Sequence, residues 1–88
     1  MFELIDRRTA ETLCGKDSVD AAGRIKPSFG HYDQLTNRVE YTAYLSLPEG
    51  GSIVAAWLVD ADMLEAMWAM DEGVWPEPTG YRVWHPAV

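Results

Sequence analysis

Five carboxylates lie close together in the second half of the chain and are the residues best placed to bind a ligand or a partner. They are Asp60, Asp62, Glu65, Asp71 and Glu72, and no basic residue lies among them. Asp60, Asp62 and Glu65 superficially suggest a Ca²⁺ site, but they lack the alternating Asx residues, the loop glycine and the distal glutamate of a calcium loop. We therefore expect no metal here, and we expect the stretch to repel phosphate and attract basic protein surfaces.

Residues that could supply nucleophilic or metal chemistry are few and scattered. Cys14 is the only cysteine, and the two histidines that could activate it, His31 and His85, are distant in sequence. Cys14 is expected at the C-terminal end of a helix, where the helix dipole raises a thiol pKa. Neither histidine has a second ligand at metal-binding spacing. The sequence therefore predicts no catalytic residue, no metal, no cofactor and no enzyme activity.

The charge of the chain is divided unevenly along its length. Residues 1–38 hold six acids and six bases, whereas residues 39–88 hold eight acids and one base, Arg82. The net charge of −7 therefore comes from the second half. A face of this kind can simply keep a small apolar protein in solution. It also disfavours direct contact with nucleic acid.

All four tryptophans lie in this acidic half. Trp57 and Trp68 are expected in the core of a strand and a helix. Trp75 precedes two prolines in a stiff loop, so its ring either packs back on Trp84 or Pro76 or marks a partner surface. We include Trp75 with the five carboxylates in the predicted partner-binding set.

Residues 38–70 contain the main elements that position these side chains. Their sequence predicts a β-hairpin followed by a helix. Residues 39–47 alternate in polarity as a half-buried strand does, 48–51 have turn composition, and 52–59 are apolar on both faces. Asp60 is suited to cap an amphipathic helix extending to Met70. The alternative is one long helix over 52–70.

Shorter elements are expected on either side of the hairpin. Asp6 caps a helix that runs through Cys14 and ends at Gly15. Residues 17–23 are expected to be a polar connection, 24–32 an edge strand, 33–37 a turn, and 81–85 a final strand. Short connections favour antiparallel pairing in chain order.

These elements predict an α+β fold: a small antiparallel sheet of three to four strands, one amphipathic helix packed on it and a short N-terminal helix. Residues 1–88 are expected to form a single domain. The first residues do not have the pattern of a secretory signal, and the longest apolar run is too short to span a membrane. We therefore expect a cytoplasmic protein.

In size, acidity and lack of catalytic motifs, with 60–72 as the local feature, the chain resembles small inhibitors encoded by phages and mobile elements, among them the anti-CRISPR proteins. The resemblance implies a nucleic-acid mimic that occupies a basic, nucleic-acid-binding surface of a bacterial defence complex. It thus predicts a non-catalytic protein-binding inhibitor. The alternative is a structural or assembly protein that forms a homodimer, or joins a larger complex, through Trp75, Trp84 and an edge strand.

Overall fold

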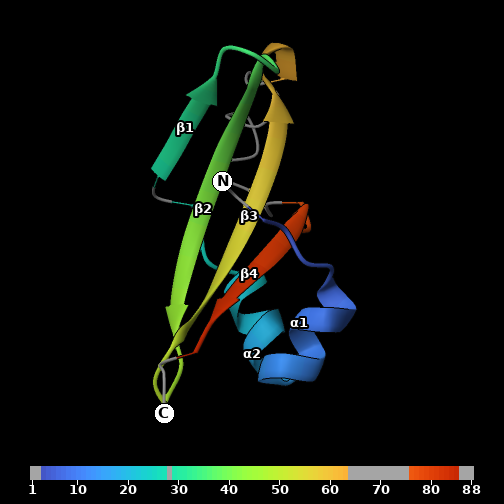
Figure 1. Ribbon diagram of the computed structural model, residues 1–88. Helices are drawn as coiled ribbons and strands as arrows, with labels where there is room; N and C mark the ends of the chain where they lie inside the picture. Colours follow the sequence, from blue (N-terminus) through green and yellow to red (C-terminus); the bar gives the residue numbers. More distant parts are fainter. Residues whose placement is uncertain (1–2, 28, 64–75, 86–88) are drawn as a thin grey trace.

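The computed structural model describes residues 3–27, 29–63 and 76–85, and these form a four-stranded antiparallel sheet with two helices (Figure 1). The strands lie in chain order and are β1 (Phe29–Asp33), β2 (Arg38–Ser46), β3 (Ser52–Asp60) and β4 (Gly80–Trp84). The helices are α1 (Arg7–Cys14) and α2 (Lys16–Gly23). This arrangement confirms the predicted α+β class and the antiparallel order.

The hairpin of β2 and β3 is confirmed, together with its turn. Gly50 and Gly51 both adopt positive φ, 91° and 84°, which is where glycine has no steric cost. Leu47 donates its N–H to the Gly51 carbonyl and accepts from the Gly50 N–H, each across 3.1 Å. The alternative of one helix over 52–70 is wrong, because residues 52–60 are a strand that pairs with β2 on one side and β4 on the other.

Helix α1 begins and ends where the sequence predicts. The carboxylate of Asp6 accepts a hydrogen bond from the Thr9 backbone N–H across 2.7 Å, which satisfies one of the free donors at the helix start. Gly15 ends the helix with φ of 90°.

The predicted polar connection at 17–23 is wrong, because these residues belong to α2. Val19 and Ala22 are one turn apart and fully buried, so packing against the sheet stabilises a helix whose own apolar pattern is short. The positive φ of Gly15 lets the second helix begin at once, and the Gly15 carbonyl accepts from the Val19 N–H across 3.2 Å.

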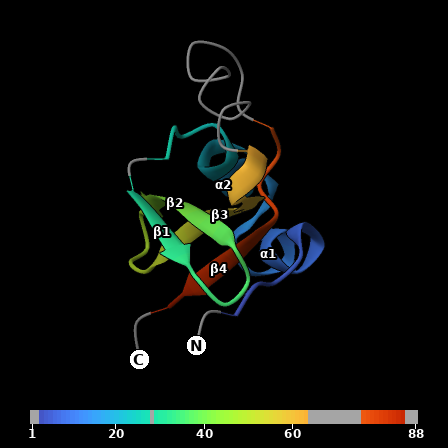
Figure 2. The same cartoon turned by 90° about the horizontal axis from the view of Figure 1, so that it is seen from above.

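Figure 2 shows the two helices beside the sheet, and the core lies between them and one sheet face. Trp57, at the middle of β3, is 1% exposed, which confirms its predicted core position. Trp68 lies outside the described residues. The buried apolar cluster consists of Ala10, Val19, Ala22, Ala43, Ile53, Ala55, Trp57 and Tyr81.

The edges of the sheet differ from each other. The predicted edge strand at 24–32 exists as β1, but it begins only at Phe29, because α2 extends to Gly23 and Ile25 packs against the core instead. At the other edge Ile5 bridges β4: it donates to the Tyr81 carbonyl across 2.8 Å and accepts from the Tyr81 N–H across 3.0 Å.

A 3-10 turn (Ala61–Met63) follows β3 at the start of the predicted amphipathic helix. The remainder of that helix, residues 64–70, lies outside the described residues. Within the described part of the chain, no helix is long and apolar enough to cross a lipid bilayer.

Candidate functional site

Two of the predicted partner-binding residues, Asp60 and Asp62, are exposed at the end of β3. Asp60 ends β3 directly before the 3-10 turn, and its carboxylate pairs with the Arg38 guanidinium across 3.3 Å. The helix that Asp60 was predicted to cap lies mostly outside the described residues. Both partners are more than half exposed, so solvent screens the pair and its contribution to stability is small. The other predicted members, Glu65, Asp71, Glu72 and Trp75, lie outside the described residues.

The strand register adds two acids that the sequence analysis did not include. Arg38 lies opposite Asp33 on β1 and opposite Asp60 on β3, while Glu40 lies between His31 and Leu58. Because side chains alternate along a strand, these residues share the sheet face that is turned away from the helices, which we call the open face. Only its two ends are exposed, since Thr42, Val54 and Ala56 at its centre are buried. We call Asp33, Glu40, Asp60 and Asp62 the acidic strand end.

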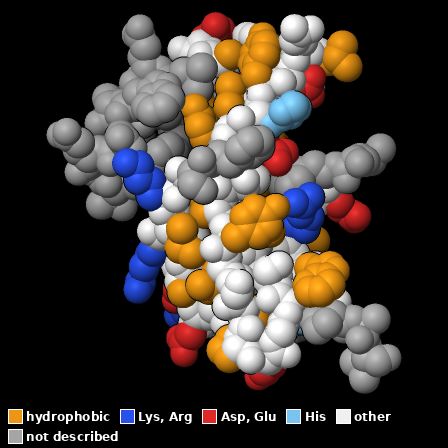
Figure 3. Space-filling view, turned by 90° about the vertical axis from the view of Figure 1, so that its left-hand side faces the viewer, with side chains coloured by type: hydrophobic (Ala, Val, Ile, Leu, Met, Phe, Trp, Pro, Cys, Tyr) orange, Lys and Arg blue, Asp and Glu red, His pale blue; other side chains and the backbone are white. Residues whose placement is uncertain are grey.

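A hollow of about 210 Å³ lies at the acidic strand end, lined by His31, Asp33, Thr36, Arg38, Glu40 and Leu58. Figure 3 shows acidic side chains near a histidine on the part of the surface that it presents. Two acids thus join Asp60 and Asp62 through strand pairing, and not through closeness in sequence. The register of the predicted hairpin could have shown that Glu40 lies on the same face as Asp60.

Two aromatic side chains are exposed farther along the same face. Tyr44 and Trp84 are 62% and 60% exposed, respectively. Tyr44 lies opposite Val54, which lies opposite Arg82, and Trp84 is two residues beyond Arg82 on β4. Large rings at the surface beside charged groups are typical of protein-binding hot spots. The open face therefore carries acids at one end and exposed aromatic rings toward the other.

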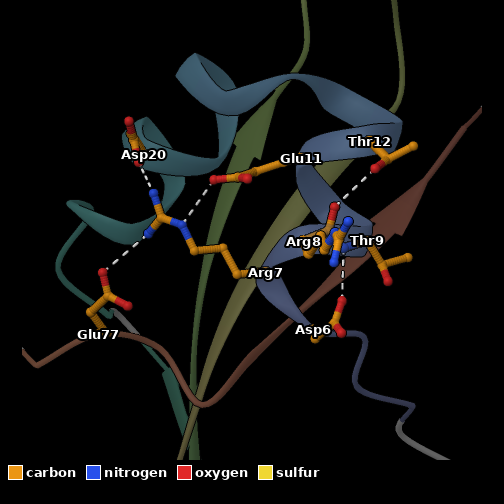
Figure 4. Close-up of polar contacts among 8 residues, drawn as sticks. All are labelled: Asp6, Arg7, Arg8, Thr9, Glu11, Thr12, Asp20 and Glu77. Atoms are coloured by element: carbon orange, nitrogen blue, oxygen red, sulfur yellow. Dashed lines mark hydrogen bonds and ion pairs between the residues drawn. The ribbon is translucent and has the colours of Figure 1, made fainter.

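A second cluster lies on the helix side of the molecule, where three carboxylates converge on the guanidinium of Arg7 (Figure 4). Nε bonds Glu11 across 3.0 Å, Nη1 bonds Glu77 across 3.1 Å, and Nη2 bonds Asp20. The bond to Glu11 is the main cause that raises the pKa of Arg7, so the cation is permanent. The three carboxylates come from α1, α2 and the segment before β4, so Arg7 ties these elements together.

A pocket of about 250 Å³ adjoins this cluster, and we call it the Arg7 pocket. Its lining consists of Arg7, Asp20, Gly23, Arg24, Pro76, Glu77, Pro78 and Tyr81. Tyr81 is 1% exposed, and its hydroxyl has no hydrogen-bond partner among the described residues. Burial raises the pKa of Tyr81, and the charge of Arg7 opposes that effect. The phenol is therefore neutral over the physiological pH range.

A third hollow, of about 270 Å³, brings together Cys14 and His85, which the sequence separates by most of its length. Ser18 and Glu49 line the same space. Burial is the main cause that raises the pKa of the Cys14 thiol, and the charge of Glu49 adds to it. A thiol held protonated in this way is a poor nucleophile. Across the described residues, no three His, Cys, Asp or Glu side chains are arranged to hold a metal ion.

The described fold and sites thus define a small α+β protein with an acidic, partly aromatic sheet face. No protein-family model matches the chain, and neither the curated proteins nor the solved structures contain a match.

Proposed function

We propose that this protein is a non-catalytic acidic interaction module that docks on a basic, nucleic-acid-binding surface of a bacterial defence complex, as a phage-encoded inhibitor of the anti-CRISPR kind does. The observation that carries the proposal is the placement of Asp33, Glu40 and Asp60 on one sheet face, with Asp62 next to them. Carboxylates spaced along a rigid sheet can present negative charge as a phosphate backbone does.

Two further observations support this proposal. The excess of acids over bases in residues 39–88 gives the half of the chain that contains β2 and β3 a strong negative charge. Tyr44 and Trp84 are exposed on the same face and can supply apolar contacts beside the charged ones. Charge then guides the encounter with a basic partner, while the rings slow its dissociation.

An affinity pull-down from bacterial lysate at low and high salt tests the proposal. The test variant carries Glu40→Lys and Asp62→Lys, both at the acidic strand end. The control variant carries Glu3→Lys and Glu49→Lys, which change the net charge by the same amount at other exposed positions. We expect a nucleic-acid-binding partner that is lost at high salt and lost in the test variant only. Equal capture by both variants would refute docking through the acidic strand end.

A second function, a structural or assembly protein that forms a homodimer, is favoured by the exposed ring of Trp84 and by the place of β1 at the edge of the sheet that the described residues form. A strand edge presents unpaired N–H and C=O groups to which another chain can add. Trp75, which the sequence analysis assigned to this interface, lies outside the described residues. If the protein has this assembly function, the acidic residues only keep it in solution.

The oligomeric state in solution distinguishes the two functions. Light scattering after size-exclusion chromatography should show a monomer at low and high salt if the protein is a docking inhibitor. A dimer that persists at high salt and is lost on Trp84→Ser would favour the assembly function. Tyr44→Ser is the matched control, since it removes an equally exposed ring from the same face.

A further inference from the structure

We propose that the Arg7 pocket is a binding site for a primary alkylammonium group, presented by a lysine side chain of a protein partner. This site lies on the helix side of the molecule and is separate from the acidic strand end. It therefore goes beyond the proposed function, and either can fail without the other.

The first observation is the Tyr81 hydroxyl. The residue is 1% exposed and its oxygen has no hydrogen-bond partner in the described part of the chain, although it lines the pocket. A buried hydroxyl without a partner costs free energy, and proteins rarely retain one. The oxygen has two lone pairs, so it can accept a hydrogen bond from a donor that enters the pocket.

The second observation is the local excess of negative charge. Glu11, Asp20 and Glu77 each use one oxygen to bind Arg7, and none of their other oxygens makes a hydrogen bond within the described residues. Asp20 and Glu77 line the pocket together with Arg7 and Arg24, and Glu11 binds Arg7 from outside that lining, so three carboxylates and two guanidinium groups lie at this site. One negative charge is left without compensation, which favours a cation as the ligand.

The third observation is the size and shape of the space. A volume of about 250 Å³ is below the range of roughly 300–1,000 Å³ typical of pockets for drug-sized molecules, and it suits one long side chain. Pro76, Pro78 and Gly23 form its apolar walls, against which methylene groups can pack. The pocket is therefore shaped for an aliphatic stem with a compact charged head.

The head group follows from the acceptors. Asp20, Glu77 and Tyr81 come from α2, the segment before β4, and β4, so they approach the space from different directions. An ammonium group has three donors that point in different directions, whereas the donors of a guanidinium lie in one plane. The three acceptors therefore suit an ammonium better than a guanidinium.

Titration of the isotope-labelled protein with n-butylammonium, followed by the backbone amide signals of Gly23, Arg24 and Tyr81, tests the site. Tetramethylammonium chloride at the same ionic strength is the control, because it has the same charge and no N–H donor. We expect saturable shifts at these three amides with n-butylammonium only. Equal shifts with tetramethylammonium, or no saturable shift with n-butylammonium, would overturn the proposal. Butyrate and n-butylguanidinium are titrated in the same way, and tighter binding of either would also overturn it.

Two variants test the assigned acceptors. Tyr81→Phe removes the hydroxyl and keeps the ring, and it should weaken n-butylammonium binding by about three- to tenfold, as expected for one lost hydrogen bond. Glu77→Gln removes a charge from a side chain that is 79% exposed, so it leaves the core untouched and should weaken binding further. Tyr44→Phe removes an exposed hydroxyl elsewhere and should leave the affinity unchanged. Unchanged affinity in both pocket variants would refute the assignment.

The source of the ammonium is resolved by comparing Nα-acetyl-lysine N-methylamide with free spermidine. A lysine that binds at least as tightly as n-butylammonium supports docking of a protein side chain, since its backbone then fits outside the pocket. If spermidine binds and Nα-acetyl-lysine N-methylamide does not, the ligand is a free amine, and the proposal of a lysine from a protein partner is overturned.

Discussion

Trp57 donates its indole N–H to the carbonyl oxygen of Pro76 across 2.8 Å, and this bond fixes the segment before β4 to the centre of β3. Nineteen residues separate the two in sequence. The bond holds Pro76 and its neighbours where they form one wall of the Arg7 pocket. A core residue thereby positions a surface site.

Trp57→Phe should therefore destabilise the protein by about 1–3 kcal/mol, because it removes the hydrogen bond and leaves a gap in a packed core. The free energy of unfolding from urea denaturation measures this effect. Trp84→Phe, at a site that is 60% exposed, is the control and should change stability by less than about 0.5 kcal/mol. Similar losses in the two variants would contradict the assigned role of Trp57.

Tyr81→Phe should stabilise the protein by about 1 kcal/mol in the absence of any amine, because the buried hydroxyl has no partner among the described residues. Thermal unfolding gives the comparison with the parent chain. Tyr44→Phe, with its hydroxyl on a 62% exposed side chain, should be neutral. A clear loss of stability on Tyr81→Phe would show that the hydroxyl is satisfied in solution.

The hairpin and α1 were predictable because their signals are local. Alternation marks β2, two glycines mark its turn, and Asp6 and Gly15 mark the ends of α1. Helix α2 was missed because its buried face consists of Val19 and Ala22, and alanine contributes little to an apolar pattern. Only packing on the sheet, which sequence periodicity does not report, makes that short helix stable.

The sites were less predictable than the elements. Asp60 and Asp62 were found as part of an acidic stretch, whereas Glu40 joins them only through the pairing of β2 with β3. The Arg7 pocket has no local signal, since Asp20 and Glu77 meet at Arg7 from elements far apart in the chain. Such a site can be predicted only when the packing of α1, α2 and β4 is known.

The helix cap at Asp6 should make stability depend on pH in the acidic range. The side-chain hydrogen bond with Thr9 is the main cause that lowers the pKa of Asp6 from its ordinary value of 3.8. A lowered folded-state pKa means that the contribution is complete above the unfolded value and is lost as pH falls through the folded value. Asp6→Asn keeps a capping oxygen but removes this titration.

Urea denaturation of the parent and of Asp6→Asn over a pH series measures the effect. The parent should be the more stable at neutral pH, and the difference should shrink as the pH falls below 3.8. Glu3→Gln, at an exposed acid outside the helix, is the control and should show no such change. A difference that does not depend on pH would contradict a charged cap.

Gly80 lies against the chain before α1, with no room for a side chain. A Cβ atom at Gly80 would lie 2.9 Å from Leu4 Cδ2, 3.0 Å from Leu4 Cβ and 3.2 Å from the Ile5 carbonyl oxygen. The last two contacts involve atoms that can move only with the backbone, so Gly80→Ala should push this segment off the edge of β4. We expect loss of the Ile5–Tyr81 bridge and a cost of about 1–3 kcal/mol.

Hydrogen exchange at the Ile5 amide tests this expectation directly, because that N–H bonds the Tyr81 carbonyl across 2.8 Å. Exchange should be faster in Gly80→Ala, while amides at the centre of β3 keep their relative protection. Ser46→Ala, at the exposed end of β2, is the control. If exchange at Ile5 matches that of the parent, the bridge does not depend on the missing side chain at Gly80.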